Sequence, residues 1–583
     1  MDFCYNCNKV FRKTGMKINI VFLLIVSVLS GCSEKTVKKS LKIIEGPGTV
    51  ADSGMVVSAQ PQSSRIGVQI LQKGGNAVDA AVATEFALAV CYPEAGNIGG
   101  GGFMVIRTYD GKTDVIDFRE KAPSLATRNM YLNEAGTVSE GLSTETHLAS
   151  GVPGTVDGLI SAHSKYGILP FREVIQPAID LAENGFTITR EQAEDLNNNR
   201  TQFIERNSVR PAFVRDSLWK EGDIMVQTAL SGTLKRIRDS GRDGFYSGLT
   251  ARLITKEMKR GNGILTDQDL KKYTSVSRIP VSTDYKGFKI ISAPPPSSGG
   301  IILIQLLRMI EPYPVNEWGF HSFQTIHLMV EAERRAFADR SEFIGDPDYM
   351  QIPSDKLFGK KYLLHSMSTF DEKRASPSMA IKPGSPEGYS NEETTHLSVV
   401  DAKGNAVALT TTLNGTFGNS IVVDSAGFLL NNQMDDFSVK PGYPNMYGLI
   451  GGEINSVQPG KRILSSMTPT IVEKEGKLFL VVGSPGGSTI PTTVFQVIVN
   501  VIDFKMNIRE AVDAGRFHHQ WLPDWISFEK NAIDSLTIKT LTVMGHEFKS
   551  RNSIGRVNAI MVLSDGKKAA GADIRGNNSS CGY

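Results

Sequence analysis

Residues 394–413, TTHLSVVDAKGNAVALTTTL, contain the pattern that decides the fold. The first seven have the composition of a buried strand, and residues 406–413 have that of a second one. Gly404 and Asn405 supply a turn between them, so the two runs are predicted to form a β-hairpin. A threonine of the second strand, Thr410, Thr411 or Thr412, would then lie near Thr394.

Thr394 follows an abrupt change in composition. Residues 371–393 are charged, rich in Pro and Ser and poor in apolar side chains, so they are predicted to form an exposed, flexible linker. If the Glu393–Thr394 bond were cut, Thr394 would start a new chain. Its α-amine, with an ordinary pKa of about 7.7–8.0, could then act as the base for its own hydroxyl. The simpler alternative is a threonine that only opens a strand.

Other segments on both sides of the hairpin form a set with it. They are residues 96–104 (GNIGGGGFM), 117–120 (DFRE), 414–419 (NGTFGN), 430–437 (LNNQMDDF), 461–467 (KRILSSM), 482–488 (VGSPGGS) and 516–521 (RFHHQW). Together they resemble the γ-glutamyltranspeptidases (γ-glutamyltransferase, glutathione hydrolase), which are N-terminal nucleophile hydrolases. The resemblance runs from about Val56 to the C-terminus.

The resemblance implies a four-layer αββα sandwich built from two self-cleaved subunits that stay together as a heterodimer. The large subunit would span residues 46–393 and the small one residues 394–583. Helical periodicity at 64–71, 77–90, 159–166, 174–184, 229–240, 301–310 and 326–337, with strand patterns at 103–109, 114–118 and 288–292, suits this arrangement. Length alone suggests several domains, but the sequence has no internal repeat and no domain-sized break in composition.

The resemblance also assigns the reacting groups. Thr394 would attack the carbonyl of Glu393 during self-cleavage, and then the γ-glutamyl amide of glutathione or a related compound. Thr412 would hydrogen-bond the Thr394 hydroxyl, and Gly486 and Gly487 would donate to the oxyanion, near the start of a helix predicted at 492–502. Taken singly, Thr412 is a common strand residue and a Pro-Gly-Gly-Ser run is a common turn.

The substrate carries a free ammonium and a free carboxylate, and the family's positions for both are occupied. The ammonium would bind Asn414, Gln433 and Asp436, and the carboxylate would bind Arg119, Ser465 and Ser466. Tyr447 would close a lid loop at residues 441–448. Arg119 alone would more commonly form a surface ion pair. Strand alternation predicts that Asp435 points away from Asp436.

Several features limit other functions. A net charge of +2 gives no argument for nucleic acid, and Cys4 and Cys7 lack the second pair of a zinc site. No cofactor or metal is implied, and His396, His518 and His519 are predicted to be structural. Cys91 should be buried, with no reason to pair with Cys581. Two departures from the family pattern are Ile463, where a proline is usual, and an irregular tail at residues 571–583.

The start of the chain is predicted to be an export signal. An apolar run at 18–29 ends in Leu29-Ser30-Gly31-Cys32, which resembles a bacterial lipobox, so residues 1–32 would be a signal peptide and residues 33–45 a tether. Met16 could be the true start. A lipidated Cys32 would anchor the protein at the periplasmic face of the cell envelope, and Ser33 favours the outer membrane. The alternatives are a plain cleaved signal or an uncleaved membrane anchor.

The sequence leaves competing functions open. The first is a γ-glutamyl hydrolase or transferase. Within the same fold, a β-lactam acylase or a poly-γ-glutamate depolymerase would use the same nucleophile. Outside enzymes, the chain could be a non-catalytic lipoprotein that binds or supports a partner. The sequence does not separate water from an amino acid or dipeptide as the preferred acceptor.

Overall fold

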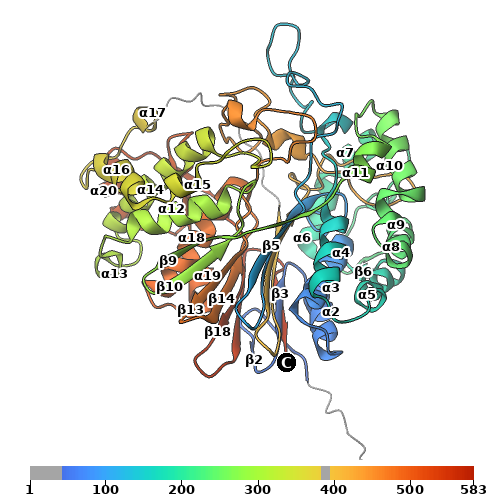
Figure 1. The fold of residues 1–583 in the computed structure, drawn as a ribbon, viewed down its shortest axis with the longest axis horizontal. Helices are drawn as coiled ribbons and strands as arrows, with labels where there is room; N and C mark the ends of the chain where they lie inside the picture. The colour runs from blue at the N-terminus through green and yellow to red at the C-terminus, as the bar shows by residue number, and fades with distance from the viewer. Residues whose placement is uncertain (1–41, 382–393) are drawn as a thin grey trace, which may run out of the picture. The chain divides into compact units, whose positions relative to one another are not determined.

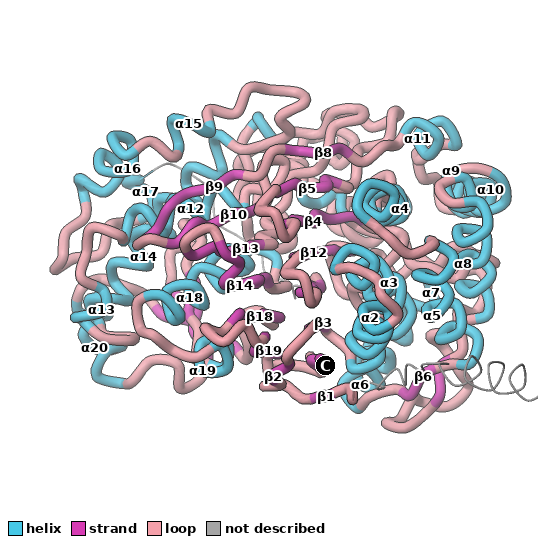
Figure 2. The backbone as a smooth tube through the Cα atoms, turned by 60° about the horizontal axis from the view of Figure 1, so that its bottom comes forward, coloured by secondary structure: helices cyan, strands magenta, loops and turns pink. Residues whose placement is uncertain are grey.

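The computed structural model describes residues 42–381 and 394–583. Within the unit Ile43–Tyr583, two β-sheets lie face to face between two sets of helices (Figure 1; Figure 2). This is the predicted four-layer αββα sandwich. The predicted signal peptide, Cys32 and the Glu393 side of the predicted cleavage site lie outside the described residues.

The first sheet has eight strands, and all of its neighbouring strands pair antiparallel. In spatial order they are β1 (Ile44–Glu45), β20 (Ser579–Gly582), β3 (Met55–Ser58), β11 (Thr395–Val400), β12 (Ala406–Thr412), β4 (Gly101–Arg107), β5 (Thr113–Asp117) and β8 (Val276–Arg278). β11 and β12 are the predicted hairpin, with Thr395 opposite Thr411. The tail that departs from the family pattern supplies β20, between β1 and β3.

The second sheet has seven strands, also antiparallel. They are β2 (Val50–Ala51), β19 (Lys568–Ala572), β18 (Asn558–Val562), β14 (Lys477–Gly483), β13 (Thr470–Lys474), β10 (Phe288–Ser292) and β9 (Val281–Tyr285). Smaller sheets join β15 (Phe517–His518), β16 (Ile526–Glu529) and β17 (Phe548–Arg551), and β6 (Phe186–Thr187) with β7 (Ile224–Met225). Both large sheets combine strands from before and after Thr394, so neither side of the predicted cut forms either large sheet by itself.

Helices cover the outer face of each large sheet (Figure 1). Beside the first sheet lie α2 (Pro61–Gln72), α3 (Ala77–Cys91), α4 (Thr155–Tyr166), α5 (Phe171–Asn184), α6 (Arg190–Asn198), α7 (Arg200–Arg206), α8 (Thr228–Ser240), α9 (Asp243–Tyr246), α10 (Gly248–Arg260) and α11 (Asp267–Lys272). Beside the second lie α12 (Gly299–Ile310), α13 (Val315–Trp318), α14 (Phe323–Phe343), α15 (Ser354–Leu357), α16 (Lys360–Ser366), α17 (Ser378–Ile381), α18 (Ile490–Ile502), α19 (Ile508–Asp513) and α20 (Ser535–Val543). Short 3₁₀ turns are η1 (His147–Ala149), η2 (Met367–Thr369), η3 (Gln433–Asp436), η4 (Glu453–Asn455) and η5 (Gly487–Thr489). Across the described ranges, no helix combines the length and hydropathy needed to cross a bilayer.

The helix α3 shows why the first layer packs closely. Every residue of this Ala-rich helix is buried, because small side chains on all sides allow α2, α5 and the first sheet to approach its backbone. Asn76 caps its start by accepting hydrogen bonds from the backbone N–H groups of Val78 and Asp79. Cys91, at its end, is buried and has a free thiol, and Cys581 is a second free, buried thiol.

Alternate side chains of β11 and β12 belong to two different hydrophobic cores, one beneath the helices and one between the sheets. On β11 and β12, Leu397, Val399, Val407 and Leu409 pack against the helices. Val400, Ala406 and Ala408 pack between the two sheets. Because successive side chains point to opposite faces, Thr410 and Thr412 also face the layer between the sheets. The hairpin therefore carries Thr412 to the end of this inner layer, beside Thr394.

In the first part of the predicted linker, residues 371–381, most positions are exposed, as composition predicted, but the backbone is bound to the protein at several points. His327 on α14 lies 2.8 Å, Nε2 to O, from the Asp371 carbonyl, and the Ser376 N–H donates to Glu331 at 3.0 Å. The Ser378 N–H donates to Asp524 at 2.7 Å, and Ser378 is fully buried. The segment therefore lies on the surface, where His327 and Glu331 of α14 and Asp524 bind its backbone. Residues 382–393 lie outside the described residues.

Candidate active site

Thr394 lies directly before β11, opposite Thr412 on the hairpin. Its hydroxyl oxygen is 3.3 Å from that of Thr412, and either hydroxyl could donate. The backbone N–H of Asn414 donates to the Thr412 hydroxyl oxygen at 2.9 Å, which fixes the position of that side chain. Thr394 is only 4% exposed. The hairpin register thus brings the predicted nucleophile next to its predicted partner.

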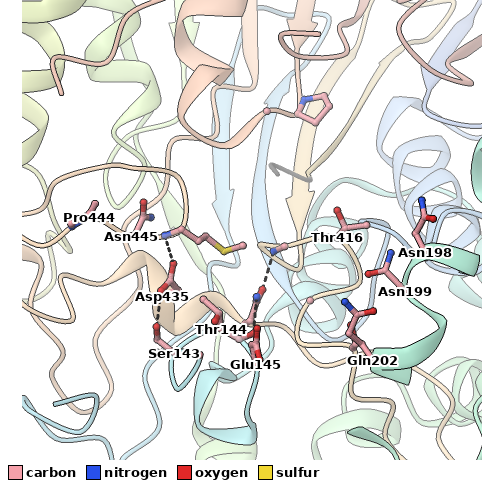
Figure 3. A pocket seen from close by; sticks show the side chains of 18 of the residues that line it. Ser143, Thr144, Glu145, Asn198, Asn199, Gln202, Thr416, Asp435, Pro444 and Asn445 are labelled. Atoms are coloured by element: carbon pink, nitrogen blue, oxygen red, sulfur yellow. Dashed lines mark hydrogen bonds between the residues drawn. The ribbon is translucent and has the colours of Figure 1, made fainter. Parts of the chain in front are cut away.

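A large polar cavity of about 1190 Å³ opens beside this pair (Figure 3). In Figure 3, Ser143, Asp435 and Asn445 lie on one wall and Asn198, Asn199 and Gln202 on another. At three places in the chain, one residue lines this outer cavity and its neighbour lines a small inner pocket. The outer cavity is lined by Gly415, Met446 and Gly486, and the inner pocket by their neighbours Asn414, Tyr447 and Gly487. The two spaces therefore meet at these positions, and the outer cavity is the approach to the inner pocket.

The inner pocket contains the predicted site residues. It is lined by Arg119, Thr394, Thr412, Asn414, Gln433, Asp436, Tyr447, Leu449, Ser465, Ser466, Met467, Gly487 and Ile490. Every predicted site residue in the described ranges lies here except Gly486, which lines the outer cavity. The free volume is about 20 Å³, hardly more than one water molecule needs. The inner pocket is small because the side chains that would bind a substrate, such as Arg119 and Asp436, bind one another instead.

Arg119 follows β5 and is 1% exposed, so it is not a surface ion pair. Its Nε donates to the Ile463 carbonyl at 3.0 Å, and its Nη2 donates to the Leu464 carbonyl at 2.9 Å. Nη2 also donates to Oδ2 of Asp436 at 2.7 Å. The two carbonyls hold the guanidinium plane in place, so its fork can present a charge to a carboxylate.

Asp436 accepts hydrogen bonds from three side chains. Besides Arg119, the Gln433 side-chain amide donates to it at 2.7 Å and that of Asn445 at 3.0 Å. Asp436 and Gln433 lie in η3, so the strand assumed for this segment was wrong. Asp435 does point away from the pocket, but because of the 3₁₀ turn. It accepts from the Ser143 hydroxyl at 2.7 Å and the Met446 N–H at 2.8 Å, and burial raises its pKa to about 6.

The loop at residues 441–448 closes over the inner pocket. The Tyr447 hydroxyl donates to the backbone carbonyl of Asn414 at 2.6 Å. The side-chain amide of Gln520 donates to the Tyr447 carbonyl at 3.0 Å, and Tyr447 is only 4% exposed. A hydroxyl bound to the strand end beside Thr412 holds the loop shut, so opening this loop requires that bond to break.

The two glycines lie where the outer cavity meets the inner pocket. Gly486 has φ of 131° and Gly487 has φ of 50°, backbone conformations that L side chains rarely adopt. A Cβ on Gly486 would also lie 2.4 Å from the Thr489 hydroxyl. η5 starts at Gly487 and continues into α18, so the backbone N–H groups here lie at the positive end of a helix. The helix starts two residues before the predicted residue 492, at Ile490.

Ser465 and Ser466 lie on the chain segment that holds Arg119. The Ser465 hydroxyl oxygen accepts from the Met467 N–H at 3.1 Å, and both serines are buried. Ile463, which departs from the family pattern, donates its N–H to the Glu120 carbonyl at 3.1 Å. Proline has no N–H and could not make this bond. The departure therefore adds a backbone contact beside Arg119.

The three histidines that sequence reasoning set aside do not line the inner pocket. His396 lies between the hydroxyls of Thr410, at 2.8 Å, and Ser398, at 3.1 Å, and burial lowers its pKa to about 3. Burial likewise lowers the pKa of His518 to about 3 and that of His519 to about 4. All three are neutral at ordinary pH.

One group in the described ranges has the residue types of a metal site: His327, Glu331 and His546. Its ligand atoms are already engaged. Nδ1 of His327 lies 2.8 Å from Nε2 of His546, and Glu331 accepts from Arg335 at 2.6 Å. Arg334 adds a second guanidinium at 3.3 Å. A cation would have to displace both arginines, so the group fits an internal ion pair better than a metal.

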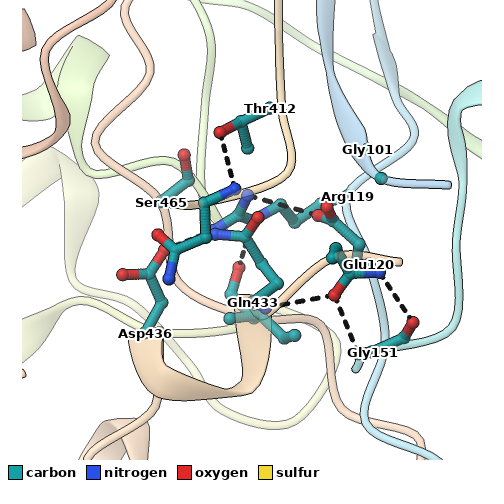
Figure 4. A network of polar contacts seen from close by, with 12 residues as sticks. Gly101, Arg119, Glu120, Gly151, Thr412, Gln433, Asp436 and Ser465 are labelled. Atoms are coloured by element: carbon teal, nitrogen blue, oxygen red, sulfur yellow. Dashed lines mark hydrogen bonds and ion pairs between the residues drawn. The ribbon is translucent and has the colours of Figure 1, made fainter. Parts of the chain in front are cut away.

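Two residues that touch this site were not predicted as part of it. Asn445 donates to Asp436 from the loop that carries Tyr447. Glu120 is fully buried next to Arg119, with its Oε2 3.2 Å from Nη1 (Figure 4). Both belong to segments already singled out, but only the folded chain shows which of their neighbours they reach.

Comparison with known proteins is consistent with this geometry. The gamma-glutamyltranspeptidase family model matches residues 63–583. The glutathione hydrolase proenzyme of Escherichia coli (strain K12) is 48% identical over 531 residues, covering 90% of this chain and 91% of that protein.

Solved structures agree with both the fold and the family. Cephalosporin acylase from Bacillus halodurans has a TM-score of 0.80 at 25% identity, over 92% of this chain and 97% of that one. A chain of Helicobacter pylori gamma-glutamyltranspeptidase has a TM-score of 0.55 at 46% identity, over 56% of this chain and 94% of that one. With a family model that spans most of its length and close relatives over nine-tenths of it, this chain belongs to the gamma-glutamyltranspeptidase family.

Proposed function

We propose that this protein is a self-cleaving γ-glutamyl hydrolase and transferase that acts on glutathione and related γ-glutamyl amides. The observation that carries the proposal is the Thr394–Thr412 hydroxyl pair in a buried pocket that also holds Arg119 and Asp436. The hydroxyl pair supplies the nucleophile, and the two charged groups match the two charges of a γ-glutamyl donor.

Self-cleavage creates the catalytic amine. The Thr394 hydroxyl oxygen attacks the Glu393 carbonyl carbon, the C–N bond breaks, and the leaving nitrogen takes up the hydroxyl proton to become the new α-amine. Water then hydrolyses the resulting ester, which leaves a carboxylate on Glu393 and a free hydroxyl on Thr394. The large and small subunits stay together because both sheets contain strands of each.

In turnover the α-amine of Thr394 takes the hydroxyl proton as the oxygen attacks the γ-amide carbonyl. Backbone N–H groups at Gly486 and Gly487 stabilise the oxyanion, an interaction whose loss typically costs about 10²–10³ in rate. The leaving amine takes the proton, and a γ-glutamyl ester on Thr394 remains. Water or an acceptor amine then attacks the ester and regenerates the hydroxyl.

Substrate recognition exchanges one ion pair for two. In the closed pocket Arg119 and Asp436 bind each other at 2.7 Å. The α-carboxylate of the donor replaces Asp436 at Arg119, and the α-ammonium replaces Arg119 at Asp436. The exchange leaves the net charge of the pocket unchanged, so little uncompensated charge is buried.

A related amidase is the main alternative, since cephalosporin acylase shares this fold. An acylase substrate without an amino-acid head would leave Arg119, Asp436 and the two serines without their ligands. The full set of these residues favours a γ-glutamyl donor, and it argues against a β-lactam acylase and a poly-γ-glutamate depolymerase. The presence of Thr394, Thr412, Gly486 and Gly487 argues against a non-catalytic lipoprotein.

We further propose that the protein is exported and lipid-anchored through Cys32, facing the periplasm. Support comes from the apolar run at residues 18–29 and the Leu-Ser-Gly-Cys ending. The register of the first sheet is compatible with it. Ile44 pairs with Gly582, Gly582 with Met55, and Met55 with Val400, so β1 lies at the end of β11 that is farthest from Thr394.

The test uses protein expressed without residues 1–32, analysed by intact mass and denaturing gel. Wild type should give two fragments, the smaller one starting at Thr394, while Thr394→Ala stays uncut. Thr395→Ala is the matched control: its neighbouring hydroxyl has no hydrogen-bond partner among the described residues, so this variant should be cut. A folded wild-type chain that stays whole, or a Thr394→Ala protein that is cut, would remove the nucleophile assignment.

A γ-glutamyl anilide assay then measures turnover of the cut enzyme. Adding glycylglycine should raise the rate of anilide release if an amine competes with water for the ester. A rate that stays flat with increasing glycylglycine would contradict the transferase activity and leave hydrolysis intact.

A further inference from the structure

Arg119 shares its single charge between two carboxylates. Asp436 accepts from Nη2 at 2.7 Å, and Oε2 of Glu120 lies 3.2 Å from Nη1 on the other side (Figure 4). Nε and Nη2 are also occupied by the carbonyls of Ile463 and Leu464. Within the described ranges, Nη1 has no hydrogen-bond partner. Glu120 therefore faces the one part of the guanidinium that is not otherwise engaged.

Glu120 is held in a position where water cannot reach it. Its side chain is fully buried, and no donor in the described ranges hydrogen-bonds to either carboxyl oxygen. The carboxyl group packs on Gly101 at the start of β4, where a Cβ would lie 2.7 Å from Oε2. The Ile463 N–H binds the Glu120 backbone carbonyl at 3.1 Å. A carboxylate in such a place normally has hydrogen-bond donors, so their absence needs an explanation.

The charged groups around Glu120 favour a bound proton. Asp436 on η3 and Asp117 at the end of β5 add negative charge, although Asp117 is itself paired with Arg278 at 2.6 Å. The charge of Glu120 also helps to raise the pKa of the Tyr246 phenol, on α9. Burial raises the pKa of Glu120 to about 7, with Arg119 opposing the shift. Near neutral pH the carboxyl can hold or release its proton.

We propose that Glu120 is a proton-binding counter-ion of Arg119, and that it takes up a proton from solvent when the α-carboxylate of the γ-glutamyl donor binds to Arg119. Glu120 does not touch the reacting atoms. It is a positioning residue that sets how much of the Arg119 charge is available to the substrate. The inference rests on the proposed γ-glutamyl activity.

The charges explain the direction of this coupling. The donor ammonium compensates Asp436, but nothing in the donor compensates Glu120. Asp436 bonds only to Nη2, whereas the donor carboxylate that replaces it can also accept from Nη1, which faces Glu120 and has no hydrogen-bond partner within the described ranges. Negative charge thus moves closer to Glu120, and a nearby like charge raises the pKa of a carboxyl. Once protonated, Glu120 is neutral and Arg119 keeps its full charge for the donor. Donor affinity should therefore be higher below pH 7 and fall as pH rises above it.

The test measures protons taken up on binding. L-glutamate, the product of hydrolysis, is titrated calorimetrically into the self-cleaved enzyme in two buffers of different ionisation enthalpy. At pH 6 Glu120 is already protonated, so its contribution to uptake should be small. At pH 8 it should be close to one proton per glutamate bound, which corresponds to a loss of affinity of up to about tenfold per pH unit.

Variants isolate the contribution of Glu120. Glu120→Gln should remove this uptake and make L-glutamate affinity nearly independent of pH between 6 and 8. The α-amine of Thr394 also titrates in this range, but it is present in both proteins, so the difference between them reports on Glu120. Glu85→Gln is the matched control, because Glu85 on α3 is another fully buried carboxyl without a hydrogen-bond partner in the described ranges. It should behave like wild type.

Kinetics give a second readout. For anilide hydrolysis, wild-type KM should rise with pH above 7, while KM of Glu120→Gln stays flat and the pH profile of kcat is shared. If Glu120→Gln fails to self-cleave, Glu120→Asp carries the test. Its shorter side chain withdraws the carboxyl from Nη1 and should shift the midpoint of proton uptake by half a pH unit or more.

The outcomes separate the two proposals. Uptake by Glu120→Gln equal to that of wild type, or a Glu120→Asp profile identical to that of wild type, overturns the role of Glu120. A merely structural residue would change affinity by the same factor at every pH. Failure of wild type to bind L-glutamate at any pH would instead count against the γ-glutamyl activity itself.

Discussion

Asp436 and Asp435 are adjacent carboxylates in one 3₁₀ turn, and we expect their asparagine variants to differ sharply. Asp436→Asn places an amide where Arg119, Gln433 and Asn445 all donate. The new NH₂ group cannot accept from any of them, so at least one donor loses its partner. More importantly, the donor ammonium no longer meets a negative charge.

The magnitude follows from the contacts. In the free enzyme the Arg119–Asp436 bond breaks when substrate binds, so its loss costs the bound state little. What is lost is one charge-assisted hydrogen bond to the ammonium, a contribution of about 1.5–3 kcal/mol. At about 1.4 kcal/mol per factor of ten, kcat/KM should fall about 10- to 150-fold, mostly through KM.

Asp435→Asn makes the same chemical change one residue earlier. Asp435 accepts from the Ser143 hydroxyl and the Met446 N–H. An asparagine can still accept from Met446, and its NH₂ can donate to the Ser143 hydroxyl, which also accepts. Because the pKa of Asp435 is raised to about 6 by burial, little charge stabilisation is lost. We expect kcat/KM to stay within about threefold of wild type, since no charged contact to the donor changes.

The assay is anilide hydrolysis at pH 7.5 with both variants, after gel analysis shows that each has cut itself. Binding of L-glutamate provides a check that does not depend on turnover. Equal losses in the two variants would refute the placement of the ammonium at Asp436. An Asp436→Asn enzyme whose KM equals that of wild type would also refute this placement of the ammonium.

Two further predictions concern the glycine turn and the buried histidines. Gly486→Ala puts a Cβ 2.4 Å from the Thr489 hydroxyl at a φ of 131°. We expect kcat to fall about 10²–10³-fold, while L-glutamate affinity, measured by calorimetry, stays near that of wild type. Equal losses in kcat and in affinity would contradict an oxyanion role for this turn. His396 and His518 have pKa values lowered to about 3 by burial, below the value of about 6.5 in an unfolded chain. The unfolded state therefore binds more protons, and stability should fall as pH drops below 6.5, by up to about 1.4 kcal/mol per pH unit for each histidine. Thermal unfolding at pH 7 and 4.5 should show a smaller drop in Tm for His396→Gln than for wild type, and equal drops would contradict this account.

The sequence predicted the hairpin and most of the inner pocket because local pattern and family motifs report on the same residues. The hairpin pattern placed one of three threonines beside Thr394, the family motifs selected Thr412, and they also supplied Arg119 and Asp436 across more than 300 residues of chain. The predicted direction of Asp435 was right, but the strand assumed for it was wrong, because a single 3₁₀ turn has no periodic signal in the sequence. Composition correctly predicted exposure for most of residues 371–381, but it could not show the backbone contacts of that segment, because their partners lie on α14 and at Asp524. Glu120 was visible in the DFRE motif, but only the fold shows that its carboxyl has no hydrogen-bond donor among the residues that the structure describes.

The way the two parts of the chain alternate within the sheets has a consequence for the mature enzyme. β11 and β12 lie between β3 and β4, so each part contributes strands that the other part needs on both sides. While the chain is whole, these strands are tethered and meet at a high effective concentration. After the cut, a molecule that unfolds releases two separate polypeptides that must find each other again in dilute solution. Heat inactivation of the cut enzyme should therefore become hard to reverse, whereas the uncut Thr394→Ala chain keeps the tether that allows unimolecular refolding. Self-cleavage thus gives Thr394 its free α-amine, and it also removes the tether that makes refolding reversible.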